Sequence, residues 1–276
     1  MAYEKLDKEP LDYLPCRYGA SKILFRGPKR SLDGDYIVAL GGTETYGRFM
    51  ERPYPAILEQ EAGVKVINMG CQNAGLDVFL NDQSVLDACN GARATVIQIP
   101  GAANMSNRFY AVHPRRNDRF LRASNLLKAI YREVDFTEFN FTRHLLTTLK
   151  EISEDRFAMV EQELREAWVA RMKTLIPRVR SRVVLLWLAD HPISQGAQAG
   201  LLGPDPLFVD EEMINEVRPF VHDICEVVVS PEEIEVGKDS LLFAETDRAA
   251  ADQMLGSVAH LKASHALEAG LLDRSR

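Results

Sequence analysis

The sequence predicts an α/β protein built on a parallel five-stranded sheet. Five short apolar runs rich in β-branched residues recur along the chain, at 36–40, 65–69, 94–99, 183–189 and 224–229. Near-continuous runs of this kind are typical of parallel strands buried on both faces. Helical patterns separate the runs, at 54–61, 77–89 and 211–221. Alternating strands and helices favour a doubly wound, flavodoxin-like sheet with right-handed crossovers.

The 276 residues fit one α/β domain, 1–276, that carries a large insertion. Residues 1–35 precede the first strand as an N-terminal arm, and residues 109–180 form a helical insertion after the third strand. Apolar residues at steps of three and four predict two helices in the insertion, over 141–152 and 157–175, joined by a polar turn. A last helix is expected over 257–272, beginning at a serine that can cap it.

Composition excludes several classes of protein. The formal net charge of -7 argues against a general nucleic-acid binder. The first residues lack the apolar segment of a signal peptide and no apolar run is long enough to span a bilayer, so we expect a cytoplasmic protein with no membrane partner. The four cysteines have no CxxC spacing and no Walker or GxGxxG motif occurs, so we expect neither a metal nor another cofactor. The sequence is compatible with a homo-oligomer.

Small and amide-bearing residues follow each of the first three strands directly, at 41–47, 68–75 and 101–108. In an open parallel sheet, ligands bind beyond the carboxyl ends of the strands, where the strand order reverses. We therefore expect these three loops to form the binding site for a small-molecule or carbohydrate ligand.

The order and spacing of these loops resemble the SGNH (GDSL-like) hydrolase and acyltransferase superfamily. The matching residues are Gly41, Thr45, Tyr46 and Gly47 in the first block, Asn68 and Gly70 in the second, and Gly101 and Asn104 in the third. The resemblance covers residues 36–108 and, more weakly, 245–270. It implies a three-layer sandwich and an esterase or acyltransferase that acts on an acyl ester or an acylated carbohydrate.

The chain departs from this superfamily at the catalytic positions. The nucleophilic serine is replaced by Thr43, whose hydroxyl can act as a nucleophile when a base is near, and the preceding aspartate is replaced by Gly42. The resemblance implies that an oxyanion or another anion is held by the Thr43 N–H and by N–H and amide donors of Gly42, Gly70, Asn73, Gly75 and Asn104.

Two histidines are candidates for the general base. The superfamily places Asp-x-x-His before the last helix, but an ungapped match puts Met254 at that histidine. His260 lies nearby, either as the base or as a structural residue. His191 follows the fourth strand, either as the base or as part of a turn. Adjacent residues in an extended chain point in opposite directions, so we do not expect Asp190 to orient His191.

Charged residues beside the loops suggest an alternative function. Arg48 follows the first block, and Arg108, Arg115 and Arg116 follow the third. Arginine binds phosphate, sulfate and carboxylate bidentately, so these residues indicate a binding protein or transferase for an anionic ligand, such as a nucleotide. They could instead pair with nearby acids. Glu44, next to the nucleophile position, is a base, a partner of an arginine, or a solvated surface residue.

Overall fold

A parallel sheet forms the centre of the molecule. The computed structural model describes residues 11–195 and 202–272, and within them one sheet has five strands. These are β1 (Tyr36–Gly41), β2 (Lys65–Gly70), β3 (Ala94–Gln98), β6 (Arg182–Ala189) and β7 (Asp223–Val228). Their order is β2-β1-β3-β6-β7 and every neighbouring pair is parallel. This is the order of flavodoxin-like doubly wound sheets, and it reverses between β1 and β3. The predicted fold class is confirmed.

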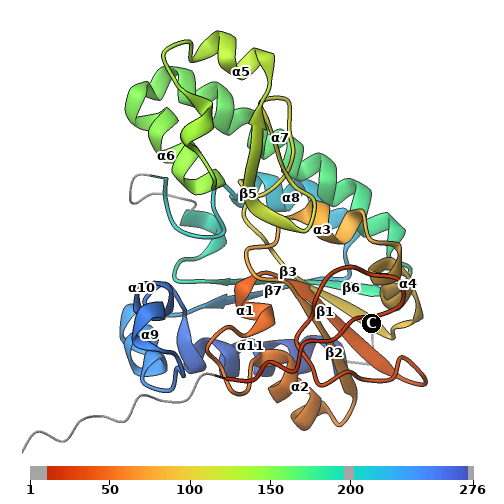
Figure 1. Ribbon diagram of the computed structural model, residues 1–276. Coiled ribbons are helices and arrows are strands. Elements are labelled where there is room, and N and C mark those ends of the chain that lie inside the picture. The colour runs from red at the N-terminus through yellow and green to blue at the C-terminus, as the bar shows by residue number, and fades with distance from the viewer. Residues whose placement is uncertain (1–10, 196–201, 273–276) are drawn as a thin grey trace, which may run out of the picture.

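Helices cover both faces of the sheet (Figure 1). One face carries α2 (Tyr54–Ala62), α9 (Pro231–Lys238) and α11 (Gly256–Leu272), and the other carries α3 (Leu76–Leu80), α4 (Gln83–Gly91), α7 (Glu154–Leu175) and α8 (Glu211–Val217). The single helix predicted over 77–89 is two helices, because the Asp82 carboxylate accepts from the N–H groups of Ser84 and Val85 and so starts a new helix.

The core lies in two layers, one on each face of the sheet. Along β1, Ile37 and Ala39 pack toward α2 and α11, whereas Val38 and Leu40 pack toward the other layer. Both sets are buried because each face of the strand is covered by helices. This double burial explains why the strand reads as a continuous apolar run.

The insertion between β3 and β6 forms a lobe above the sheet (Figure 1). It begins with an antiparallel hairpin of β4 (Tyr110–His113) and β5 (Arg116–Ala123), which the expectation of a helical insertion did not include. Then follow α5 (Asn125–Ile130), the 3-10 turn η1 (Phe136–Glu138), α6 (Thr142–Ile152) and α7. The two expected helices are present, and the Ser153 hydroxyl accepts from the Arg156 N–H to cap α7.

Short elements complete the fold. They are α1 (Thr43–Tyr46), η2 (Ile176–Arg178), η3 (Ile193–Gln195), η4 (Arg218–Phe220), η5 (Glu245–Asp247) and α10 (Arg248–Ala251). The described part of the N-terminal arm pairs Cys16 with Phe25 and buries Phe25 against the core, whereas residues 1–10 lie outside the described residues. None of the helices in the described ranges is both long enough and apolar enough for a membrane span.

Candidate active site

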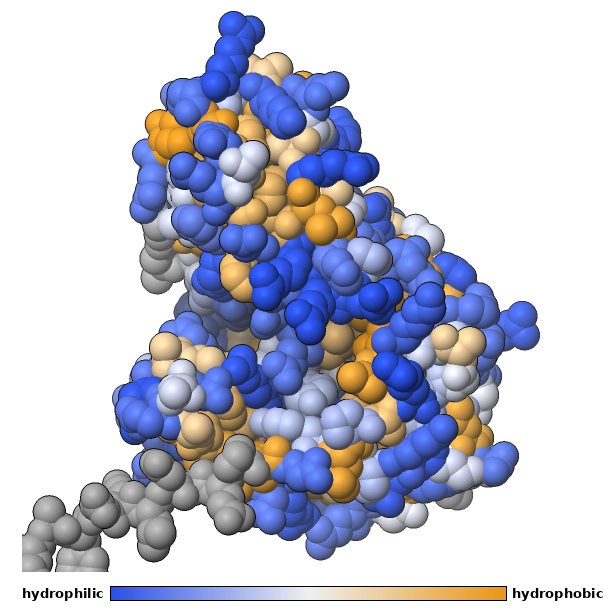
Figure 2. Space-filling view, viewed as in Figure 1, coloured by the Kyte–Doolittle hydropathy of each residue, from blue (hydrophilic) through white to orange (hydrophobic). Residues whose placement is uncertain are grey.

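A cavity of about 730 Å³ opens at the carboxyl end of the sheet, where the strand order reverses. We call it the cleft. Its walls come from the loops after β1, β2, β3 and β6, from the start of α6, from residues 203–207, and from the segment between α10 and α11. Figure 2 shows the surface hollowed between the lobe of the insertion and the part of the molecule that carries α10. The cleft therefore lies where the sequence predicts the site.

The turn that carries Thr43 is held by side chains of neighbouring strands. Gln98, the last residue of β3, accepts from the N–H of Gly42 at 3.3 Å and of Thr45 at 3.1 Å. The amide of Asn68 on β2 donates to the Thr45 carbonyl at 2.7 Å. Since both side chains extend from strands of the sheet, α1 has a fixed position and Thr43 lines the cleft.

Thr43 and Asn73 are joined by two hydrogen bonds. The Thr43 hydroxyl donates to Asn73 Oδ1 at 3.1 Å and accepts from the Asn73 N–H at 3.0 Å. Asn104 Nδ2 donates to the Asn73 carbonyl at 3.0 Å, and the Thr142 hydroxyl donates to Asn104 Oδ1 at 2.6 Å. The three residues expected to form the centre of the site thus form one network, from three different loops.

Fewer N–H groups are free to bind an anion than the sequence implies. The N–H groups of Gly42, Gly70 and Gly75 each donate to a side-chain oxygen, at 3.3, 2.9 and 3.1 Å, and so are already used. A Cβ on Gly75 would lie 1.5 Å from the Asn104 carbonyl oxygen, so this glycine allows two loops to touch. Among the described residues, the Thr43 N–H has no acceptor, and the Asn104 amide has a second hydrogen to donate.

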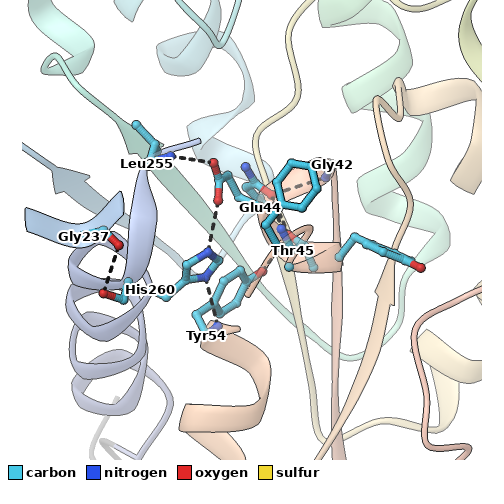
Figure 3. Close-up of polar contacts among 12 residues, drawn as sticks. Gly42, Glu44, Thr45, Tyr54, Gly237, Leu255 and His260 are labelled. Atoms are coloured by element: carbon cyan, nitrogen blue, oxygen red, sulfur yellow. Dashed lines mark hydrogen bonds and ion pairs between the residues drawn. The ribbon is translucent and has the colours of Figure 1, made fainter. Parts of the chain in front are cut away.

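His260 lies between Tyr54 and Glu44 (Figure 3). It lies on α11 with 0% exposure, and its Nδ1 accepts from the Tyr54 N–H at 3.1 Å. Its Nε2 lies 3.1 Å from Glu44 Oε2, close but poorly aligned for a hydrogen bond, and Glu44 Oε1 accepts from the Leu255 N–H at 3.0 Å. Nδ1 is occupied by the Tyr54 N–H and Nε2 faces the Glu44 carboxylate, so this histidine packs against and positions Glu44, which lines the cleft.

His191 is arranged relative to Asp190 as His260 is relative to Glu44: a mostly buried ring contacts a carboxylate. Its Nδ1 lies 2.7 Å from Asp190 Oδ1, so the expectation that Asp190 does not orient it is wrong. The chain bends directly after β6, and the argument from an extended chain therefore does not apply. The ring is 9% exposed and packs edge-on against Trp187, whereas the Asp190 side chain lines the cleft.

The cleft is acidic. Of the described residues that line it, four are carboxylates, Glu44, Asp118, Asp190 and Asp205, and one is cationic, Arg143. Arg143 pairs with Asp205 at 2.9 Å. Within the described ranges, no histidine is hydrogen-bonded to the Thr43 hydroxyl and no group of three or more His, Cys, Asp or Glu could hold a metal ion.

The four arginines fall into two groups. Arg48 pairs with Asp247 at 3.0 Å and Arg108 pairs with Glu163 and Glu166, so both form the ion pairs that the sequence left open, and neither lines the cleft. Arg115 and Arg116 lie at the β4–β5 turn and line a second pocket beside the cleft. Glu44 has no arginine partner among the described residues.

Three residues of the site were missed at the level of sequence. Gln98 had a visible signal, since it is a polar residue at the end of an otherwise apolar strand. No sequence signal marked Asp118 as a site residue, because the hairpin that carries it was not predicted. Asp190 was considered only as a partner of His191, although its own side chain faces the cleft.

Comparisons with known proteins give one family and several weak structural likenesses. No curated protein matches the sequence. Similar solved structures include the acetylxylan esterase Axe2 from Geobacillus stearothermophilus, with 18% identity, a TM-score of 0.39, and coverage of 88% of this chain and 98% of that chain. A GDSL-like lipase from Parabacteroides merdae has 13% identity, a TM-score of 0.37, and coverage of 86% and 95%.

The gut microbial diltiazem-metabolizing enzyme BT4096 has 9% identity and a TM-score of 0.37, with coverage of 87% of this chain. The present chain spans only 47% of that enzyme. Likenesses at this level do not assign an activity or a catalytic residue. The family model, in contrast, matches residues 1–275. The chain belongs to the family described as "Domain of unknown function (DUF6473)".

Proposed function

We propose that the protein is an esterase or acyltransferase of the SGNH type, which acts in the cleft on an acyl ester or an acylated carbohydrate. One observation carries the proposal: the Thr43 hydroxyl lines the cleft, bonded to Asn73 at 3.0 and 3.1 Å, beside the amide of Asn104. A hydroxyl and N–H donors that converge on one cavity are what acyl transfer requires.

In this proposal Thr43 Oγ attacks the carbonyl carbon of the substrate. The carbonyl oxygen becomes an oxyanion, which the Thr43 N–H and the Asn104 amide stabilise. The hydroxyl proton passes to Asp190, whose Oδ1 is held by His191 and whose side chain is about half exposed to the cleft. The leaving alcohol then takes that proton. Water or an acceptor alcohol next attacks the Thr43 ester and gives its proton to Asp190, and the released Thr43 Oγ takes that proton back. A carboxylate is a weaker base than imidazole, so turnover should be slow.

Two substitutions at one position test the proposal. Thr43→Ala removes the nucleophile and should abolish hydrolysis of p-nitrophenyl acetate and of acetylated sugars. Thr43→Ser keeps the hydroxyl without its methyl group and should retain or raise the rate. Thr174→Ala, an exposed threonine on α7, is the matched control and should leave the rate unchanged. Equal rates in Thr43→Ala and the wild type, or no turnover by the wild type, would refute it.

A second candidate is a binding protein that catalyses no acyl transfer. The burial of both histidines behind carboxylates favours it, because Thr43 then has no imidazole partner. In that case the wild type would bind carbohydrates saturably in calorimetry without turnover, and Thr43→Ala would bind them equally well.

A further inference from the structure

A second pocket, of about 830 Å³, adjoins the cleft and shares Asn73 and Asp118 with it. We call it the basic pocket. Its polar lining is dominated by nitrogen-bearing side chains: Lys22, His113, Arg115, Arg116 and Arg119. Among the described lining residues, Asp118 is the one carboxylate. Such an excess of cations is notable in a chain whose formal net charge is -7.

The cations of the basic pocket have no carboxylate partners within the described parts of the chain. None of the ion pairs found there involves Lys22, Arg115, Arg116 or Arg119. Arg48 and Arg108, by contrast, are paired. Unpaired guanidinium groups gathered in one pocket attract anions and bind them bidentately.

The turn that carries Arg115 and Arg116 is held in one shape. His113 Nδ1 accepts from the N–H groups of both arginines at 3.2 Å. Asn117, with 0% exposure, donates to the His113 carbonyl at 3.0 Å and accepts from the Gly75 N–H at 3.1 Å. The hairpin is therefore tied to the loop after β2 that also carries Asn73.

Short contacts connect the basic pocket to the cleft. Asn73 Nδ2 donates to Asp118 Oδ2 at 3.2 Å, while Asn73 also bonds Thr43. On the same side, the Arg119 guanidinium lies 4.2 Å from the ring centroid of Phe141, which lines the cleft. Figure 2 shows strongly hydrophilic side chains gathered across the middle of this face, between the lobe and the sheet. The two pockets therefore meet at Asn73 and Asp118.

We propose that the basic pocket binds a phosphate or sulfate group carried by the substrate whose acyl group lies at Thr43. The assignment to the substrate rests on the proposed function, whereas anion binding does not. The acidic cleft holds the neutral, hydroxyl-bearing part of the molecule, and the arginines hold its anionic group. This division of charge selects a phosphorylated or sulfated acyl ester over a neutral one.

Cys71 offers a direct readout, because it lines the basic pocket. Burial, and to a smaller extent Asp118, raise the pKa of its thiol to about 11 against the opposing effect of Arg116. We expect saturating inorganic phosphate to suppress iodoacetamide alkylation of Cys71, measured by peptide mass spectrometry. Sodium chloride at equal ionic strength is the reference. If chloride protects Cys71 as well as phosphate does, the pocket is not an oxyanion site and the proposal is overturned. Sulfate is tested in parallel.

Substitutions of arginines test whether the anion binds in the basic pocket. Arg115→Ala with Arg116→Ala should raise the phosphate concentration needed for protection by about tenfold or more. Arg122→Ala, on the same hairpin but outside the pocket, should not change it. Thr43→Ala should also keep protection, so loss of catalysis and loss of anion binding are separable. Equal weakening by Arg122→Ala and by the double variant would overturn the proposal.

Two substrates that differ only in a phosphate group test whether the anion in the basic pocket is part of the substrate. An acetylated sugar phosphate should have a KM about tenfold below that of the same acetylated sugar without phosphate. The double arginine variant should remove this difference by raising the KM of the phosphorylated sugar to that of the neutral one. Equal KM values in the wild type would show that the anion in the basic pocket is not part of the substrate.

Discussion

Nε2 of His260, on α11, lies 3.1 Å from Oε2 of Glu44, which directly follows Thr43 in the chain. The other nitrogen of the same ring accepts from the Tyr54 N–H, so one buried imidazole fixes α2, α11 and the turn after β1 together. His191 holds Asp190 similarly. In both places a buried histidine stands behind a carboxylate, and the carboxylate lines the cleft.

Replacing His260 should therefore lower stability. His260→Ala leaves the buried Tyr54 N–H without an acceptor and Glu44 without its partner, which should reduce the free energy of unfolding by about 2–3 kcal/mol. His265→Ala is the control on the same helix, because His265 is largely exposed beside Glu61 and should change that free energy by less than about 0.5 kcal/mol. Urea denaturation measures both. Equal stability of His260→Ala and the wild type would show that the ring does not hold these segments.

Asp190→Asn should impair catalysis without unfolding the protein. The substitution removes the proposed base from the cleft, so kcat should fall by about 100-fold or more. Asp205→Asn is the comparison, since Asp205 also lines the cleft but is exposed and paired with Arg143. Steady-state kinetics on a neutral ester compares the two. If both variants keep the wild-type rate, Asp190 is not the base.

The sheet and the position of the cleft followed from sequence because double burial makes each strand a continuous apolar run. The β4–β5 hairpin could not be predicted, because Arg116–Ala123 carries charged residues where alternation would otherwise be seen. The roles of His260 and His191 could not be predicted from the sequence either. They depend on contacts such as that of His260 with Tyr54, between helices far apart in sequence, and no local spacing encodes them.

Two substitutions of Asn73 should separate the contributions of its backbone conformation and its side chain to stability. Its φ of 53° lies in the left-handed region, which glycine adopts freely and alanine does not. Asn73→Ala should therefore be about 1 kcal/mol less stable than Asn73→Gly, although both lose the same amide. Thermal and urea denaturation of the two variants gives the difference. An alanine variant as stable as the glycine variant would mean that this backbone conformation is not maintained.

Alkaline pH should destabilise the wild type through Tyr54. Burial raises the pKa of this phenol above its unfolded value of about 10, so its contribution to stability is complete below pH 10 and declines above it. Tyr54→Phe loses the hydrogen bond to Thr45, about 1 kcal/mol at neutral pH, but should lose less further stability between pH 9 and pH 11. Urea denaturation across this range tests it. Parallel pH profiles for the two proteins would contradict it.

The central claim is that Thr43 is the nucleophile. Finding which residue a fluorophosphonate modifies tests this claim most directly. Such a reagent bonds to an activated hydroxyl with loss of fluoride, and peptide mass spectrometry locates the adduct. We predict a stoichiometric adduct on the peptide that contains Thr43, absent in Thr43→Ala and retained in Thr43→Ser. An unmodified Thr43 in a protein that still hydrolyses esters would contradict the account.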